Sequence, residues 1–127
     1  MPIWHKMLWL AVAGACGSIA RYSLAGFVQN YSRSAFPWGT LIVNVAGCFA
    51  FGLVWALSQD RMAISPEIRT IVIVGFLGSF TTFSAFLFET EQMLEHAEWF
   101  FAVLNVLGEL TTGFAAYFLG TWIGRAM

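Results

Sequence analysis

Charged residues are sparse over most of this chain of 127 residues, and their spacing limits the folds that it can adopt. Two uncharged runs extend over residues 34–59 and 70–88, with 26 and 19 residues, and the stretches 7–32 and 99–124 each contain a single charge. An α-helix needs about 20 mainly apolar residues to cross the roughly 30 Å hydrocarbon core of a bilayer. The spacing therefore predicts four transmembrane helices, near residues 7–29, 38–58, 68–92 and 99–124.

The composition agrees with a chain that faces lipid. Hydrophobic residues make up 59% of the sequence and charged residues 10%, whereas an average soluble domain has about 25% charged residues. The six basic and seven acidic residues give a net charge of −1 and form no basic stripe for nucleic acid. A soluble enzyme, a disordered protein and a nucleic-acid-binding protein are therefore excluded. We predict an all-α integral membrane protein with one transmembrane domain over residues 1–127.

Two other interpretations of the apolar segments are less favourable. A membrane barrel would require alternating apolar and polar residues and a closed sheet, and these runs do not alternate. The first segment follows Lys6, as the apolar part of a signal peptide would. Arg21 within it and the three later spans favour an uncleaved helix.

The predicted loops are short, so the function is expected inside the membrane. The sequence has no glycine-rich phosphate loop, no metal-ligand spacing of His and Cys, and no Ser-His-Asp arrangement. We therefore expect no enzyme.

The basic residues outside the spans indicate an orientation. With four spans, Lys6, Arg61, Arg69 and Arg125 fall on the side of the two termini, and Arg33 falls on the other side. Short cytoplasmic loops have an excess of Lys and Arg. The bias modestly favours cytoplasmic termini.

Polar side chains follow one face of two predicted helices. Thr40 and Asn44 are four residues apart in the second span, and Asn105 and Glu109 are four apart in the fourth. Such stripes either join helices by hydrogen bonds or line a narrow wet path. Glu109 near the middle of a span favours a path, because an ionisable group there requires water or a partner.

The third span contains an unusual segment at residues 75–86, with the sequence GFLGSFTTFSAF. Its glycines, paired threonines and serines weaken a helix or compete for its backbone hydrogen bonds. We expect a break here, and carbonyl groups freed at a break can coordinate a cation. Phe83 and Phe86 share a face, and their ring edges have partial positive charge that can attract an anion. The two rings can equally be ordinary lipid-facing or core residues.

Three motifs together resemble a known family. Residues 14–22, GACGSIARY, are similar to a glycine-rich first helix that ends in Arg and an aromatic residue. Residues 39–44, GTLIVN, are similar to the motif GTLxxN, and residues 75–86 are similar to GFxGGxTTFSTF. In order and spacing these segments resemble the Fluc (CrcB-type) dual-topology fluoride ion channels.

The resemblance implies an antiparallel homodimer in which one subunit is inverted relative to the other. Two narrow fluoride pores would follow the subunit interface, in the inner (plasma) membrane of the cell. Such a passive pore exports fluoride from the cytoplasm and so lowers its toxicity.

The resemblance also assigns roles to residues. A central structural sodium ion would be held by the backbone carbonyls of Gly78 and Thr81, and Arg21 would lie near the aqueous vestibule. Glu89 stands where the family often has a glutamate. From the family motifs and the polar face of the fourth span we expect the pore to be lined by Asn44, Phe83, Ser84, Phe86, Asn105 and Glu109.

The sequence departs from the family pattern at several positions. Ser79 replaces a glycine, Ala85 a threonine, Leu87 a serine and Gly113 a threonine. Glu109 stands where serine is usual. An ionised Glu109 would repel fluoride, so we expect its carboxyl group to be protonated, paired or turned into a vestibule.

Two alternatives of other classes remain at this stage. Small four-helix proton-coupled multidrug exporters also form inverted dimers, but their membrane carboxylate lies on the first helix, where this chain has Arg21 instead. The chain could also be a non-conducting subunit, or one partner of a fluoride-channel heterodimer with fixed orientation.

Overall fold

The computed structural model describes residues 1–60 and 64–127, and within them all regular structure is helical. Four helical segments are long and apolar enough to cross a membrane, which confirms the number of spans predicted from the charge spacing. They are Ile3–Ser32, Trp38–Gln59, Pro66–Glu95 and Trp99–Ala126. The chain is therefore a multi-pass membrane protein.

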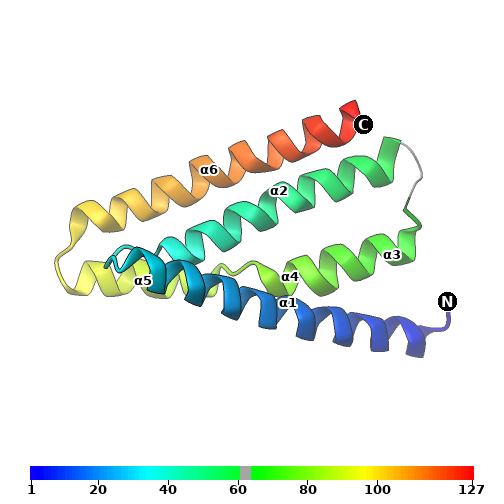
Figure 1. Ribbon diagram of the computed structural model, residues 1–127, viewed down its shortest axis with the longest axis horizontal. Helices are drawn as coiled ribbons and strands as arrows, with labels where there is room; N and C mark the ends of the chain where they lie inside the picture. Colours follow the sequence, from blue (N-terminus) through cyan, green and yellow to red (C-terminus); the bar gives the residue numbers. More distant parts are fainter. Residues whose placement is uncertain (61–63) are drawn as a thin grey trace.

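The third span consists of several consecutive elements, whereas each other span is one helix. The elements are α1 (Ile3–Ser32), α2 (Trp38–Asp60), α3 (Pro66–Thr70), the π-helix η1 (Ile71–Leu77), α4 (Gly78–Phe80), α5 (Ser84–Glu95) and α6 (Trp99–Ala126). Figure 1 shows the helices as an elongated bundle in which both termini lie at one end. Arg61, which contributes to the predicted orientation, lies outside the described residues.

Close contact between α2 and α6 depends on glycine. A Cβ atom added at Gly120 would collide with the carbonyl oxygen of Phe49, and one added at Gly52 would collide with that of Tyr117. Lipid supplies no hydrophobic drive for helix association, so small residues that let two backbones approach closely are the usual means of packing. These glycines therefore bring the polar faces of α2 and α6 together.

The loop before α2 is held by one side chain. Gln29 donates hydrogen bonds from Nε2 to the carbonyl oxygens of Ser34 (2.8 Å) and Phe36 (3.0 Å), and its Oε1 accepts one from the Gly39 N–H (3.1 Å). The last of these bonds satisfies a backbone donor in the first turn of α2, which a helix cannot satisfy internally. Gln29 thereby fixes the start of the helix that contains Thr40 and Asn44.

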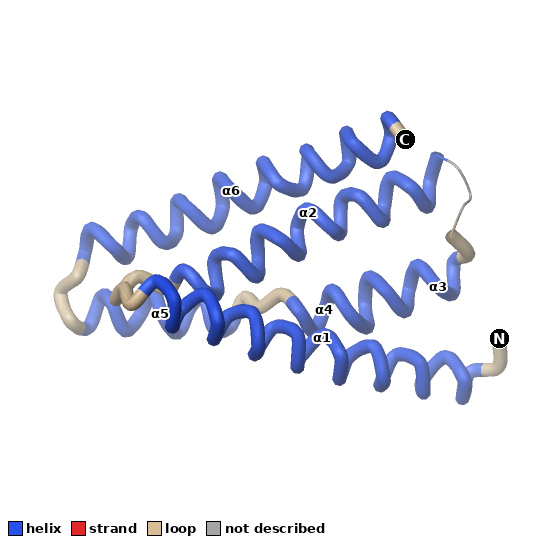
Figure 2. The backbone as a smooth tube through the Cα atoms, viewed as in Figure 1, coloured by secondary structure: helices blue, strands red, loops and turns tan. Residues whose placement is uncertain are grey.

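Between α4 and α5 lies a non-helical stretch, residues 81–83, which we call the linker (Figure 2). The backbone of Thr81 is extended, with φ −85° and ψ 156°. Two hydrogen bonds account for the change of direction. The Thr81 hydroxyl donates to the Leu77 carbonyl (2.9 Å), and the Thr82 N–H donates to Oδ1 of Asn44 (2.8 Å). The Thr81 N–H still donates to the Leu77 carbonyl (3.0 Å), so it is Asn44 that takes over a backbone donor of the helix.

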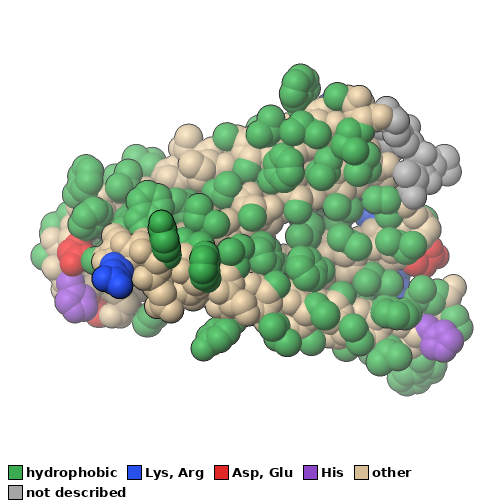
Figure 3. Space-filling model, viewed as in Figure 1, with side chains coloured by type: hydrophobic (Ala, Val, Ile, Leu, Met, Phe, Trp, Pro, Cys, Tyr) green, Lys and Arg blue, Asp and Glu red, His purple; other side chains and the backbone are tan. Residues whose placement is uncertain are grey.

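The outer surface is mostly apolar. In the face drawn in Figure 3, hydrophobic side chains cover the middle of the molecule, and most charged and histidine side chains gather near its two ends. Large aromatic side chains are exposed close to the ends of the spans, among them Trp4, Trp99 and Trp122. Both features are typical of a chain whose middle lies in lipid and whose ends lie at the interfaces.

Candidate functional site

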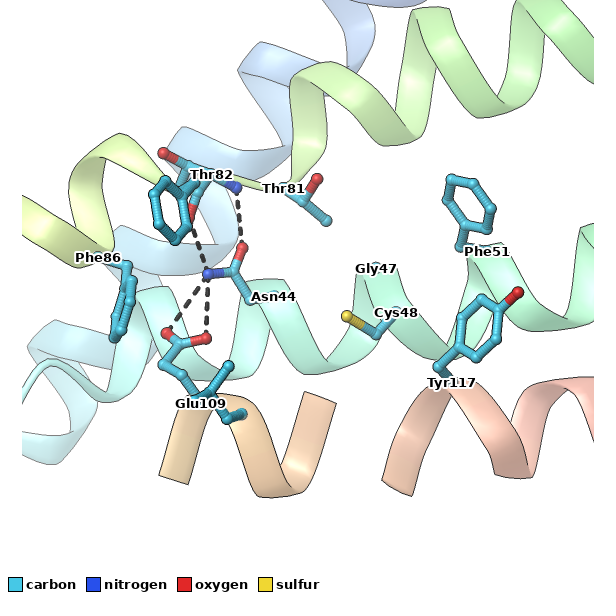
Figure 4. Close-up of a pocket in the computed structure, with 11 residues that line it drawn as sticks. Asn44, Gly47, Cys48, Phe51, Thr81, Thr82, Phe86, Glu109 and Tyr117 are labelled. Carbon is cyan, nitrogen blue, oxygen red and sulfur yellow. Dashed lines mark hydrogen bonds between the residues drawn. The ribbon is translucent and has the colours of Figure 1, made fainter. Parts of the chain in front are cut away.

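Asn44, on α2, joins three elements through its side chain. Its Oδ1 accepts from the Thr82 N–H (2.8 Å), and its Nδ2 donates to the Thr82 carbonyl (2.9 Å). The same Nδ2 donates to Oε1 (3.3 Å) and Oε2 (3.2 Å) of Glu109 on α6. Figure 4 shows the amide between the linker and the carboxyl group. Asn44 thus fixes the position of the linker and binds an acidic side chain.

A cavity of about 370 Å³ opens beside this amide. Figure 4 shows Asn44, Thr82 and Glu109 toward one end of the cavity, and Phe51 and Tyr117 toward the other. The cavity is lined by Asn44, Gly47, Cys48, Phe51, Thr81, Thr82, Phe83, Phe86, Glu109, Leu110 and Tyr117. The residues that the sequence assigned to a pore and that meet here are Asn44, Phe83, Phe86 and Glu109.

Phe83 and Phe86 form a pair at the cavity. Their ring centroids are 5.7 Å apart, with 49° between the ring planes. Phe86 is 7% exposed and packs in the core, whereas Phe83 is 70% exposed on the surface of this chain. One ring is therefore held by the fold, and the other faces lipid or a partner.

A second carboxyl group lies near the first. Glu89, on α5, accepts a hydrogen bond at Oε1 from the hydroxyl of Thr40 (2.6 Å), and its buried Oε2 has no partner among the described residues. Thr40 and Asn44 lie one turn apart on α2, so each of two successive polar side chains holds one glutamate. Glu89 also borders a cavity of about 240 Å³ that Arg21, Thr40 and Thr82 line as well.

The remaining predicted pore residues lie outside the larger cavity. Asn105 is 1% exposed and donates from Nδ2 to the hydroxyl of Thr90 (2.9 Å). Its Oδ1 is buried without a partner in the part of the chain that the structure describes. Ser84 is exposed at the start of α5, and its hydroxyl lies 3.4 Å from that of Thr82.

The backbone carbonyls expected to hold sodium lie where the helical bonds end. In a continuous helix the Thr82 N–H would donate to the Gly78 carbonyl, but here it donates to Asn44. The Ser79 carbonyl accepts from Nε of Arg21 (3.1 Å), and Thr81 is extended. Carbonyl oxygens released at an interrupted span are suitable ligands for Na⁺. The donor set of Gly78 and Thr81 therefore fits the ion.

Two residues that line the larger cavity, Cys48 and Tyr117, were not expected there from the sequence. Cys48 follows Asn44 by four positions, and Tyr117 follows Glu109 by eight. These intervals place each residue on the same helix face as the predicted one. Extending the two polar stripes by helical periodicity would have found them.

These features together define a small multi-pass membrane protein with a polar site in mid-span. The chain belongs to the CrcB family, because residues 8–121 match the family model described as "CrcB-like protein, Camphor Resistance (CrcB)". This finding confirms the resemblance seen in the sequence.

Relatives with established names cover almost the whole chain. A protein of Desulforapulum autotrophicum is 51% identical over 95% of this chain and 97% of its own length. One of Nitrosococcus oceani is 48% identical over 97% of this chain and 98% of its own. A third, of Nitratidesulfovibrio vulgaris strain Miyazaki F, is 46% identical over 95% of this chain and 98% of its own length. All three are named fluoride-specific ion channel FluC, so these relatives are ion channels and not enzymes.

Proposed function

We propose that this chain forms a fluoride-selective passive channel. The observation on which the proposal rests is the cavity where the Asn44 amide, the linker and the Phe83–Phe86 pair meet. Membership of the CrcB family and relatives named fluoride-specific ion channel FluC support the choice of ion.

The chemistry of the cavity suits a small, strongly hydrated anion. Such an ion enters only if new partners replace its lost water, and it leaves only if those partners are weak and several. The N–H groups of Asn44 and the edges of Phe83 and Phe86 offer partial positive charge. Among the described residues, no Lys or Arg lines the larger cavity, where it would bind the ion too tightly. Arg21 attracts the ion in the vestibule, and Ser84 and Asn105 extend the polar path.

The proposed assembly is an antiparallel homodimer of the single domain, residues 1–127, with one pore along each side of the interface. Phe83 is 70% exposed on the isolated chain, and Ser84 beside it is exposed in mid-span. The Ser84 hydroxyl has a long hydrogen bond of 3.4 Å to that of Thr82, and a hydroxyl group in hydrocarbon costs free energy unless its hydrogen bonds are well satisfied. A partner subunit or a wet pore covering this face would remove that cost.

A structural sodium ion completes the proposal. The carbonyls of Gly78 and Thr81 would hold it, and it would supply fixed positive charge near the pore and join the third spans of the two subunits. The Arg21 guanidinium donates a hydrogen bond to the neighbouring Ser79 carbonyl. The carbonyls of Gly78 and Thr81 are then left for the ion.

The proposed location is the inner (plasma) membrane. There the inside-negative voltage drives anions outward, so a passive fluoride channel exports the ion without another energy source and lowers its toxicity.

Growth under fluoride tests the proposal. A bacterial strain without its own fluoride exporters should grow on fluoride when it makes this chain, and should not when it makes Phe83→Leu. Rescue from cationic drugs in place of fluoride would contradict the channel and favour a proton-coupled exporter.

Tags at the two termini test the assembly. A homodimer of inverted subunits places each tag on both sides of the membrane. Tags on one side alone would contradict the homodimer and indicate a heterodimer partner of fixed orientation.

A further inference from the structure

The carboxyl group of Glu109 accepts a hydrogen bond from the side-chain N–H of Asn44 that faces the larger cavity. The Asn44 Nδ2 has two hydrogen atoms. One is donated to the Thr82 carbonyl (2.9 Å). The other is donated to the carboxyl group of Glu109, whose two oxygens lie 3.2 and 3.3 Å from Nδ2. Asn44 therefore has no further N–H for an anion in the cavity while the carboxyl group stays in place.

The described groups that face Glu109 are polar or acidic. On α2 it faces Asn44 and Cys48, and on α5 it is close enough to Glu89 to interact electrostatically. On its own helix, Tyr117 lines the same cavity. Among the residues that line this cavity there is no Lys or Arg. A carboxylate here is thus a negative charge at the polar end of the cavity, with no Lys or Arg beside it in the cavity lining.

The carboxyl group has opposite effects in its two protonation states. As a carboxylate it accepts a hydrogen bond from the Asn44 N–H. It also repels a second anion strongly, because two charges close together inside a protein are only weakly screened. As a carboxylic acid it is neutral and a weaker acceptor, so the N–H becomes available to fluoride. Carboxylate and fluoride are therefore competing ligands of one donor.

We propose that Glu109 is a proton-controlled gate: its carboxylate blocks Asn44 as a tethered anion, and fluoride passes when the group takes up a proton. The inference rests on the proposed function. The proton comes from the bulk solution and returns to it, so fluoride passage does not consume protons.

The pH dependence of fluoride flux tests the gate. Fluoride efflux from liposomes containing the purified protein is measured from pH 8 to pH 5 and corrected for protein-free liposomes. Flux through the wild type should rise by about tenfold as the pH falls, a size typical of removing one close charge. Flux through Glu109→Gln and Glu109→Ser should be independent of pH and should reach at least the wild-type level at the lowest pH. Glu109→Ser should conduct best, because it also removes the acceptor.

Glu91→Gln is the matched control. Glu91 is exposed on α5, and Oε2 of its carboxylate accepts a hydrogen bond from its neighbour Gln92 (3.2 Å). The control removes the same charge away from the cavity and should keep the wild-type pH profile. Glu89→Gln should keep a rise of flux at low pH, since Glu109 remains.

Proton uptake gives a second readout that does not depend on flux. Because carboxylate and fluoride compete for Asn44, fluoride binding must favour the protonated group, and the linkage is reciprocal. Adding sodium fluoride to the wild type in weakly buffered detergent with a pH dye should cause proton uptake that Glu109→Gln lacks. Sodium chloride is the blank.

The outcomes separate the inference from the function. Equal pH dependence in the wild type and both Glu109 variants, with fluoride flux in all three, overturns the gate and leaves the channel standing. Absence of fluoride flux from folded wild type and both variants at every pH overturns the proposed function, and the gate with it.

Discussion

The side chain of Asn44 forms hydrogen bonds to both backbone groups of Thr82, at 2.8 Å from the N–H and 2.9 Å to the carbonyl. These two bonds tie the linker to α2 across 38 positions of the chain. A linker with free backbone groups would be costly at membrane depth. Asn44 therefore stabilises the non-helical linker and also presents an amide to the cavity.

Asn44→Ala should destabilise the protein and abolish fluoride flux. The change removes the Asn44 partner of the partly buried Thr82 N–H and carbonyl, and each such loss costs up to about 1–3 kcal/mol. Thermal unfolding in detergent measures the first effect and liposome efflux the second. Asn30→Ala, at an exposed position on α1, is the control. A variant with wild-type stability would show that the linker does not need this anchor.

Thr40→Val should destabilise the fold by about 1–3 kcal/mol, because it removes the donor to Glu89 and leaves that partly buried carboxyl group unsatisfied. Adding Glu89→Met should recover most of the loss, since removing both partners costs little. A double-mutant cycle by thermal unfolding measures the coupling. Additive effects of the two substitutions would contradict a direct Thr40–Glu89 interaction.

The contact of α2 with α6 can be tested at glycines. Gly120→Ala should destabilise by about 1–3 kcal/mol, because the new methyl group collides with the Phe49 carbonyl. At Gly108, on the same helix, the added methyl group would meet no atom within 4 Å besides the nearby backbone of its own helix. Gly108→Ala should be neutral or stabilise by up to about 1 kcal/mol. Equal effects of the two changes would mean that α2 and α6 do not approach as closely as described.

Substitutions of Phe83 and Phe86 should differ in their effect on stability but not in their effect on fluoride flux. Phe86 is 7% exposed and Phe83 is 70% exposed, so Phe86→Leu should lower the free energy of unfolding by about 1 kcal/mol and Phe83→Leu should hardly change it. Both should reduce fluoride flux, because both remove a ring edge from the cavity. Wild-type flux through Phe83→Leu would place conduction elsewhere.

The spans could be predicted because charges are so costly in hydrocarbon that their spacing marks the segments directly. Asn44, Phe83 and Phe86 were expected from local motifs, and the structure brings them to one cavity. The partners of Glu89 and Glu109 could not be predicted. Which polar side chain meets which depends on how α2 crosses α5 and α6, and that crossing is set by the fit of small residues such as Gly52 and Gly120. The positions of Asn105 and Ser84 away from the cavity have the same origin.

The most direct test of the account is passive ion efflux from liposomes containing the purified protein. Internal fluoride or chloride is released by adding a potassium ionophore that sets the voltage, and each ion is followed with its own electrode. We predict rapid fluoride release with negligible chloride release, without a proton or counter-ion gradient, and loss of that release in Asn44→Ala. Equal release of the two anions, or no fluoride release from folded protein, would contradict the account.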